Sequence, residues 1–446
     1  MAQLTAGELG RKLVHMAVGG IAFAVRPLGL WGRWRRRRRR SCTTSSSSRS
    51  TAAAGSGGRT KPSADGPSAS CSIRWRSCSF VAFHARLEVA AAAWGILAFG
   101  DGMASLVGMS LGRSNPLPWN EGKSWAGTAA YTLFGGIGAT LLLVWTAPGT
   151  YSLPFALAVA FATALVAALL ESQAQGLDDN LGVPLVAGLL LYCLTMTAGH
   201  WGLIASAGFA RAAATGVAVN VVLAAAAWRT GGVGRAGAIV GVLLGSTIWA
   251  FAGWQGFLLL FVFFVLGTAA TRLGYAAKAA AGIAQEKGGR RGPGNALSKT
   301  SVPAAAAIFA ATTGRPTLFL LALAGAFATA AADTVSSEVG KAYGRRTFLI
   351  TTLRPVPRGT DGAVSLEGTI AGLLAALVVG AIGAACGLYP ASGAVAVVAA
   401  ALVATTAESV VGATLEKRGL LDNDAVNFLC SLAGALVAAA AAPLVV

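Results

Sequence analysis

One acidic residue and one Lys-Ser pair lie close together between two apolar runs of this chain. Asp101 follows an apolar run that ends at Phe99, and Lys123 and Ser124 precede the next run. The segment Gly100–Gly127 between them is rich in glycine. A carboxylate can hold Mg²⁺, a lysine adds a point charge, and glycine lets backbone N–H groups approach phosphate oxygens. These residues predict a loop for a metal-bound phosphate at a membrane surface, although they do not follow the GxxxxGK[ST] pattern of a Walker loop.

A second group of polar residues follows the next apolar stretch. Residues 128–170 are mostly apolar and break at 147–149, which indicates two membrane spans. Two spans return the chain to the same membrane face, so this group can meet Asp101 and Lys123. Carboxylates at the end of a span are costly unless they bind something. The predicted participants are Glu171, Asp178, Asp179 and Asn180.

The second half of the chain repeats this arrangement. Asp333 and Glu338 end an apolar run, and an SxxGT sequence that begins at Ser365 matches the one that begins at Ser124. The distance from this serine to the next Glu-Ser pair is 47 residues in the first half (124 to 171) and 43 in the second (365 to 408). An LDND sequence then resembles the earlier LDDN. These matches in one order predict two related catalytic units.

The composition is that of a membrane protein. The chain has 446 residues, of which 55% are hydrophobic and 12% charged, about half the charged fraction of an average soluble domain. Apolar windows near the length of a span recur throughout. They predict an all-α, polytopic helical membrane protein with roughly 11–13 transmembrane helices in two related halves. The six cysteines have no CxxC spacing, which argues against a metal cluster or a disulfide framework.

The net charge of +18 arises largely from one tract. Residues 33–79 contain twelve of the 35 Lys and Arg residues and one Asp. The tract has no aromatic interleaving of the kind that nucleic-acid binding uses, so we expect no nucleic-acid partner. Four segments follow from these patterns: an N-terminal segment (1–31), a low-complexity Arg/Ser-rich insert predicted to be disordered (32–79), and two membrane domains (80–205 and 206–446). A basic loop over 272–299 is predicted to be mostly solvated, and 303–312 is too short to span.

The motifs of the first half resemble the polyprenol kinase family, most closely its phytol and farnesol kinases. The sequences GDGMASLVG, LPWNEGKSWAGT and ES…GLDDNLGVP carry this resemblance, and GRKLVH near the N-terminus is similar to the family's RKxxH opening. Arg11, Lys12 and His15 lie in that opening and are candidates for contact with phosphate. The alternative interpretation is that these residues are only the positively charged flank of the first span. In family members, further membrane spans follow the RKxxH opening. Residues 26–87 of this chain depart from that pattern, because they contain the Arg/Ser-rich tract. This departure favours a gene-model error in 32–79. The lack of a recognisable transit peptide suggests a truncated start.

The second half resembles a different integral membrane family, which includes the plant phytyl-phosphate kinase. The sequences ADTVSSEVG, ITTLRPVPRGTDGAVSLEGT, ESVVGATLE and LDNDAVNFL carry it. The two resemblances together imply a fusion of consecutive enzymes that convert phytol to phytyl phosphate and then to phytyl diphosphate, for tocopherol and phylloquinone synthesis. They also imply CTP as phosphoryl donor, Mg²⁺, and prenyl alcohol and prenyl phosphate lipids as partners. The expected location is a chloroplast envelope or thylakoid membrane, or a plasma membrane if the source is bacterial.

The predicted roles divide the polar residues between two phosphoryl-transfer sites, which act by positioning and charge neutralisation. Predicted catalytic residues are Asp101, Lys123, Glu171, Asp178, Asp179, Asp333, Glu338, Glu408, Asp422 and Asp424. Predicted nucleotide or phosphate contacts, besides the N-terminal three, are Gly100, Gly102, Gly108, Ser124, Gly127, Asn180, Arg354, Arg358, Asp361, Ser365 and Gly368. Predicted Mg²⁺ ligands are Asp101, Asp178 and Asp333. Arg354 and Arg358 are expected to clamp the acceptor phosphate of the second reaction.

Two other functions fit part of the pattern. A transporter with two repeats would also carry acids and glycine breaks in its spans, but carrier sites lie near the bilayer midplane, whereas these acids gather on one face. A cytidylyltransferase that forms a CDP-lipid would release pyrophosphate instead of CDP. The products formed from a labelled nucleotide separate these functions.

Overall fold

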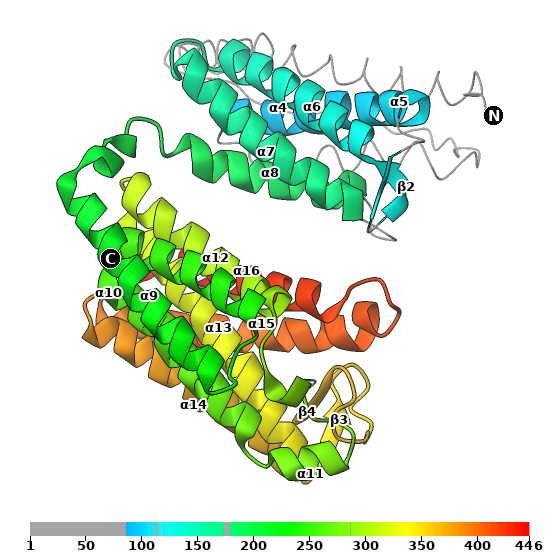
Figure 1. Ribbon diagram of the computed structural model, residues 1–446, viewed down its shortest axis with the longest axis vertical. Helices are drawn as coiled ribbons and strands as arrows, with labels where there is room; N and C mark the ends of the chain where they lie inside the picture. Colours follow the sequence, from blue (N-terminus) through cyan, green and yellow to red (C-terminus); the bar gives the residue numbers. More distant parts are fainter. Residues whose placement is uncertain (1–85, 112–114, 119, 174–178, 286, 446) are drawn as a thin grey trace, which may run out of the picture. The chain divides into compact units, whose positions relative to one another are not determined.

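The structure is a computed structural model that describes residues 86–111, 115–118, 120–173, 179–285 and 287–445 (Figure 1). The chain divides into two compact units, Met1–Ala198 and Gly199–Val446, and each is described by itself. The predicted boundary between the two membrane domains lay after residue 205. The predicted segments 1–31 and 32–79 lie outside the described residues, together with Arg11, Lys12 and His15.

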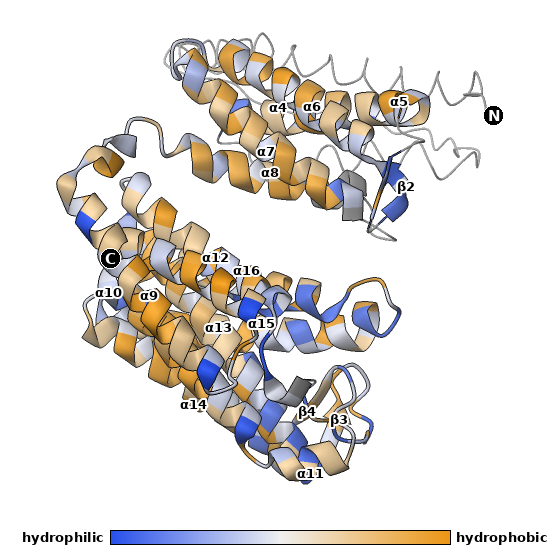
Figure 2. Cartoon of the chain, viewed as in Figure 1, coloured by the Kyte–Doolittle hydropathy of each residue, from blue (hydrophilic) through white to orange (hydrophobic). Residues whose placement is uncertain are grey.

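The described part of the chain is helical and suited to a membrane, as predicted. Nine of its helices are long and apolar enough to cross a bilayer. The sheets among the described residues are two short antiparallel hairpins. Large apolar side chains are exposed along the helices, and polar residues gather at helix ends and loops (Figure 2). This distribution suits lipid-facing helices whose backbone bonds are satisfied within each span. The prediction of 11–13 spans covered the whole chain, part of which is not described.

The first unit is built from helices and one hairpin. Its elements are α4 (Leu87–Gly95), the π-helical η2 (Ile96–Asp101), α5 (Gly102–Leu111), β1 (Pro116–Leu117), β2 (Asn120–Ser124), α6 (Trp125–Thr146), α7 (Leu153–Gln173) and α8 (Asp179–Thr195). The first three form one helical run, Leu87–Leu111, that contains Asp101. The prediction of a loop over Gly100–Gly127 is therefore wrong for its first part, Gly100–Leu111.

Close packing explains why this glycine-rich segment is helical. A Cβ atom at Gly100 would lie 2.7 Å from the Tyr131 ring of α6. A Cβ atom at Gly127 would lie 3.2 Å from the carbonyl oxygen of Ala104 and 3.5 Å from the Cα atom of Gly108. The small residues thus let two helices approach, as is common between membrane helices. Gly100, Gly102 and Gly108 were predicted to cradle phosphate from a loop, and the structure places all three in this helical run.

The second unit surrounds one central helix. Its elements are η4 (Trp201–Ala205), α9 (Ala207–Arg229), α10 (Arg235–Arg272), α11 (Tyr275–Ala280), η5 (Lys287–Gly289), α12 (Pro293–Thr312), α13 (Pro316–Tyr343), β3 (Thr347–Leu349), β4 (Ala363–Ser365), α14 (Leu366–Ala385), α15 (Ala391–Val411), the π-helical η6 (Gly412–Glu416), α16 (Asn423–Ala440) and α17 (Ala442–Val445). The central helix α13 contacts α10, α12, α14, α15 and α16. Its small residues allow this: a Cβ atom at Gly325 would lie 2.6 Å from the carbonyl oxygen of Gly434.

Two helices of this unit differ from simple expectations. Pro303 lies inside α12, a helix of 20 residues, so the segment 303–312, which was predicted to be too short to span, is the second half of a longer helix. A proline removes one backbone donor, but packing of α12 against α10, α13 and α16 maintains the helix. The 38-residue α10 is broken at Gly253, whose φ of 69° falls in the left-handed region that glycine tolerates.

Candidate functional site

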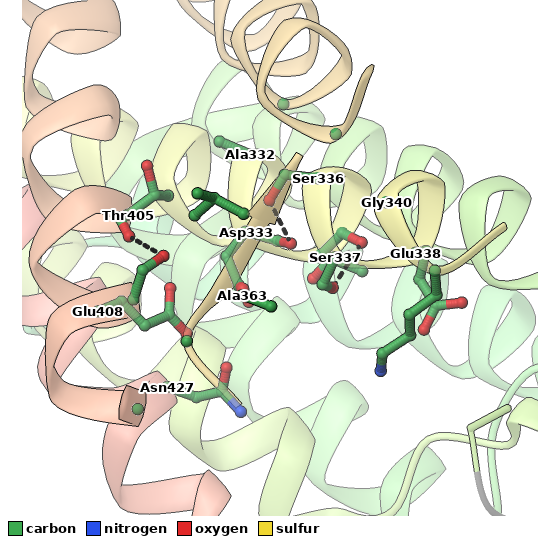
Figure 3. A pocket seen from close by; sticks show the side chains of 18 of the residues that line it. Ala332, Asp333, Ser336, Ser337, Glu338, Gly340, Ala363, Thr405, Glu408 and Asn427 are labelled. Carbon is green, nitrogen blue, oxygen red and sulfur yellow. Dashed lines mark hydrogen bonds between the residues drawn. The ribbon is translucent and has the colours of Figure 1, made fainter. Parts of the chain in front are cut away.

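A polar cavity opens in the second unit where several helices and loops meet. Its volume is about 460 Å³, and its walls come from α12, α13, α14, α15 and α16, the end of α10, the β3–β4 hairpin and the segment before α12. Figure 3 shows acidic and hydroxyl side chains of α13 and α15 on these walls, with Asn427 of α16 beside them. Six of the predicted site residues line it: Asp333, Glu338, Asp361, Ser365, Gly368 and Glu408.

Two buried lysines hold the acids of α13. Lys299 Nζ of α12 donates to Asp333 Oδ2 at 2.5 Å and to Thr334 Oγ1 at 2.9 Å. Lys278 Nζ of α11 donates to Glu338 Oε2 and also to the backbone carbonyl of Thr271. Both lysines are at most 5% exposed. The prediction that the 272–299 loop is mostly solvated is therefore wrong for them, because the loop folds back against α13 and the carboxylates offset the cost of burying ammonium groups.

Glu408 adds a third acid to this wall. It lies in the last turn of α15, and its carboxyl group interacts with Asp333 and Lys299. Cys430 Sγ of α16 donates to Glu408 Oε2 at 2.9 Å. The pair of carboxylates from α13 and α15 thus faces one lysine within the cavity. Glu408 thus lies inside the helix and not in the loop that follows it.

Three helices begin at the cavity. Asn295 in the first turn of α12, Gly368 in that of α14 and Asn423 at the start of α16 all line it. Helix N-termini carry partial positive charge and unpaired N–H groups, which favour anions. Ser365 caps α14 by accepting a hydrogen bond from Gly368 N at 3.1 Å, so that N–H is already used. The cavity therefore combines acids and lysines with helix ends that favour phosphate.

The remaining predicted residues of this half lie off the cavity wall. Asp422 is the N-cap of α16 and accepts from Ala425 N at 2.8 Å. Asp424 lies 3.5 Å from Ser298 Oγ. Arg358 donates to the exposed carbonyl of Ala342 at 3.4 Å, and Arg354 is exposed. The structure thus gives Asp422 a capping role and leaves the two predicted clamp arginines outside the cavity.

The first unit contains a related but smaller set of contacts. Lys123 of β2 forms an ion pair with Glu171 at the end of α7, and Asn120 Nδ2 donates to Ser172 O at 2.9 Å. Ser124 caps α6 by accepting from Gly127 N at 3.1 Å. The structure therefore brings the hairpin and the end of α7 together. Asp178 lies outside the described residues, and so do the side chains of Asp179 and Asn180.

Three cavity residues were missed or misjudged by sequence reasoning: Arg291, Lys299 and Asn427. Arg291 and Lys299 were predicted to belong to a solvated basic loop, as was Lys278, which lies off the cavity wall and donates to Glu338. Asn427 was not singled out. A single lysine or arginine in a glycine-rich loop belongs to no hydrophobic periodicity that would show whether it is buried. A weak signal was present in the low acid content of this loop, because any of its lysines that becomes buried must pair with an acid from elsewhere in the chain.

The described residues contain no group of three or more His, Cys, Asp or Glu side chains arranged to hold a metal ion. Mg²⁺ is usually held by one or two carboxylates, with substrate phosphates and water as the other ligands. The adjacent carboxylates of Asp333 and Glu408 fit that smaller requirement. Asp101 of the first unit lies at the end of the π-helical segment.

Comparison with known proteins identifies the family. The family model "Integral membrane protein DUF92" matches residues 218–435. An uncharacterized membrane protein of Synechocystis is 46% identical over 199 residues, 44% of this chain and 77% of the relative. The chain belongs to the DUF92 family. An uncharacterized membrane protein of Methanocaldococcus jannaschii is 31% identical over 45% of this chain and 82% of its own length.

A plant relative adds a further comparison for this DUF92 member. Protein VTE6 of Arabidopsis thaliana, a chloroplastic protein, is 40% identical over 214 residues, 46% of this chain. The match spans 64% of VTE6, slightly less than two thirds. The cavity described above lies within the residues that the DUF92 model matches. No solved structure matches this chain.

Proposed function

We propose that the second unit is a membrane kinase that phosphorylates a prenyl phosphate, with phytyl phosphate as the substrate. The observation that carries this proposal is the cavity itself, in which three helix N-termini surround a lysine-bound acid pair at the end of the spans. Helix ends of this kind favour phosphate groups. The motif resemblance to phytyl-phosphate kinase and the similarity to VTE6 support the choice of acceptor.

The reaction requires little covalent chemistry from the protein. A phosphate oxygen of the acceptor attacks the γ-phosphorus of a nucleoside triphosphate, and the bond from that phosphorus to the β,γ-bridging oxygen breaks. The nucleoside diphosphate leaves with the bond's electron pair, and the lipid becomes a diphosphate. The acceptor is a phosphate dianion near neutral pH, so the protein need not remove a proton. Catalysis then depends on positioning and on offsetting charge, which Lys299 and the helix ends can supply.

Asp333 and Glu408 are the residues that would hold Mg²⁺ in this site. A bound Mg²⁺ supplies neutralisation of the phosphate charge. Lys278 keeps Glu338 in place on the next turn of α13, so this acid is a positioning residue for the wall. CTP is the proposed donor because members of the resembled families tend to use it.

We propose phytol kinase activity for the first unit as a second function of the same chain. The specific observation is the capped helix α6 beside the Lys123–Glu171 pair, which parallels the capped helix α14 beside the second unit's acids. An alcohol acceptor must lose its proton, and a carboxylate such as Glu171 or Asp179 would take it. A chloroplast membrane is the proposed location, in line with the name of VTE6.

A lipid-product assay tests both proposals. Membranes that contain the full chain are supplied with γ-labelled CTP, Mg²⁺ and either phytol or phytyl phosphate, and the lipids are separated. We expect labelled phytyl diphosphate from phytyl phosphate, and labelled mono- and diphosphate from phytol. Label from phytyl phosphate alone would reject the first-unit activity. No labelled lipid with CTP, ATP or UTP, from folded protein, would reject the kinase function and favour a transporter.

A further inference from the structure

Arg291 is held in a defined place beside the cavity. Its backbone pairs with the segment just before α10: Arg291 N donates to Gly232 O at 3.1 Å, and Gly234 N donates to Arg291 O at 3.1 Å. Gly237 allows this approach, because a Cβ atom there would lie 2.7 Å from Arg291 O. These hydrogen bonds fix the backbone of Arg291 between α10 and α12, and its side chain lines the cavity.

The helix α10 also provides a slot for the guanidinium group. The Cζ atom of Arg291 lies 5.1 Å from the centre of the Phe263 ring, a cation–π contact. A Cβ atom at Gly267 would lie 2.1 Å from Arg291 Nη2, so a larger side chain at 267 would collide with the arginine. Phe263 and Gly267 lie one helical turn apart on α10. The slot thus sets the direction of a planar group with five N–H donors.

The charge of Arg291 is not taken up by a bond to an acid. Asp333 and Glu338 influence it electrostatically, but their carboxylates are bonded by Lys299 and Lys278. Among the described residues, no side-chain hydrogen bond from the guanidinium is found. Burial lowers the pKa of Arg291 to about 10, and the two acids oppose this change. Since that pKa lies above neutral pH, the group remains a cation with donors available to a ligand.

We propose that Arg291 is a positioning and specificity residue that binds a phosphate group in the cavity through its paired N–H donors. Guanidinium groups match phosphate oxygens bidentately, which an ammonium group cannot do. The ligand is the acceptor's phosphate monoester or a phosphate of the nucleotide. Arg291 contacts α10, a membrane-spanning helix. This position favours the lipid phosphate, because the apolar tail of the lipid must continue between the spans. This inference deepens the proposed function and rests on it.

The test compares Arg291→Gln with Arg290→Gln in the full-length protein. Arg290 is the adjacent, exposed arginine and is not on the cavity wall, so it is a matched control for the same chemical change. We expect Arg291→Gln to raise one KM about 10- to 100-fold, the range of a lost charge-assisted hydrogen bond. A raised KM for phytyl phosphate assigns the lipid phosphate, and a raised KM for CTP assigns the nucleotide. An unchanged KM for both would overturn the proposal.

A binding measurement separates this inference from the kinase proposal. Thermal unfolding of the detergent-solubilised chain is followed with and without inorganic pyrophosphate. We expect stabilisation of the wild type and of Arg290→Gln, and loss of it in Arg291→Gln. This outcome would support phosphate binding even if no kinase activity is found, and equal stabilisation of all three would overturn it. If Arg291→Gln fails to fold, Arg291→Lys keeps the charge without the paired donors, and the same loss is expected from it.

Discussion

The two units use one backbone arrangement with different charges around it. In each, a short hairpin leads into a serine that caps a membrane helix, and the capped N–H belongs to the glycine three residues later. Ser124 has φ and ψ of −134° and 153°, and Ser365 has −133° and 154°. In each, a glutamate lies in the last turn of the helix that follows the capped helix: Glu171 in α7 and Glu408 in α15.

The source of the positive charge distinguishes them. In the first unit, Lys123 stands directly before the capping serine and reaches Glu171. In the second unit the residue before the capping serine is Val364, and the lysines come from α11 and α12. The lysine in the first pair has a side chain that is 35% exposed, whereas Lys278 is 0% exposed. The comparison teaches that the hairpin and cap form the shared scaffold, while loops packed against the spans determine the local charge.

The largest expected effect separates the two proposed activities. Asp333→Asn should reduce the conversion of phytyl phosphate about 100-fold or more, because a residue that would hold Mg²⁺ is lost, in the range of 10²–10⁴ for acid–base and charge-stabilising groups. The same variant should still convert phytol to the monophosphate. Both products are measured by labelled-lipid chromatography.

The matched control for this prediction is Glu367→Gln, which removes an exposed acid near the start of α14 that does not line the cavity. It should leave both activities near wild type. Loss of both products in Asp333→Asn, from folded protein, would show that the two units do not act separately.

A second prediction compares the buried pair with the half-exposed pair. Lys278→Met leaves Glu338 without its lysine in a buried site and should lower the free energy of unfolding by about 3–5 kcal/mol. Lys123→Met removes a half-exposed lysine and should cost about 0–1 kcal/mol. Thermal unfolding in detergent gives both values, and Lys278→Met combined with Glu338→Leu should recover part of the loss. Equal losses in the two single variants would contradict the burial argument.

A third prediction concerns the glycine behind each cap. A Cβ atom at Gly368 would lie 2.5 Å from Ser336 O, whereas one at Gly127 would lie 3.2 Å from Ala104 O. Gly368→Ala should therefore cost about 1–3 kcal/mol by overpacking, and Gly127→Ala should cost less. Unfolding midpoints of the two variants test the order. A larger loss for Gly127→Ala would mean that the two helix contacts are not equally rigid.

The smallest effect should be the same in both units. Ser124→Ala and Ser365→Ala each remove one N-cap hydrogen bond and should each cost about 1 kcal/mol. Ser→Thr at the same positions keeps the hydroxyl and should cost less. The measurement is again the unfolding midpoint. A difference of more than about 1 kcal/mol between the two Ala variants would show that the caps are not equivalent.

Local sequence patterns were sufficient for the membrane architecture and for part of the site. Apolar windows predicted helices because hydrocarbon length sets the length of a span, and the SxxGT repeat pointed to Ser124 and Ser365, which the structure shows as helix caps. Asp333 and Glu408 could be found because acids at the ends of apolar runs are unusual. These signals are local, and each depends on the residue itself and its near neighbours.

Only the tertiary structure decided which charges meet. Lys278, Arg291 and Lys299 belong to a loop whose sequence is basic and glycine-rich, and nothing local distinguishes a solvated lysine from one buried against α13. Packing likewise decided that Gly102–Leu111 is helical. Glycine favours a loop where no other helix is near, but it allows close contact between helices where a partner helix is present. Arg354 and Arg358 were chosen for charge, but the fold leaves them outside the cavity. Pairing and burial depend on contacts between residues far apart in the chain, which a single sequence does not specify.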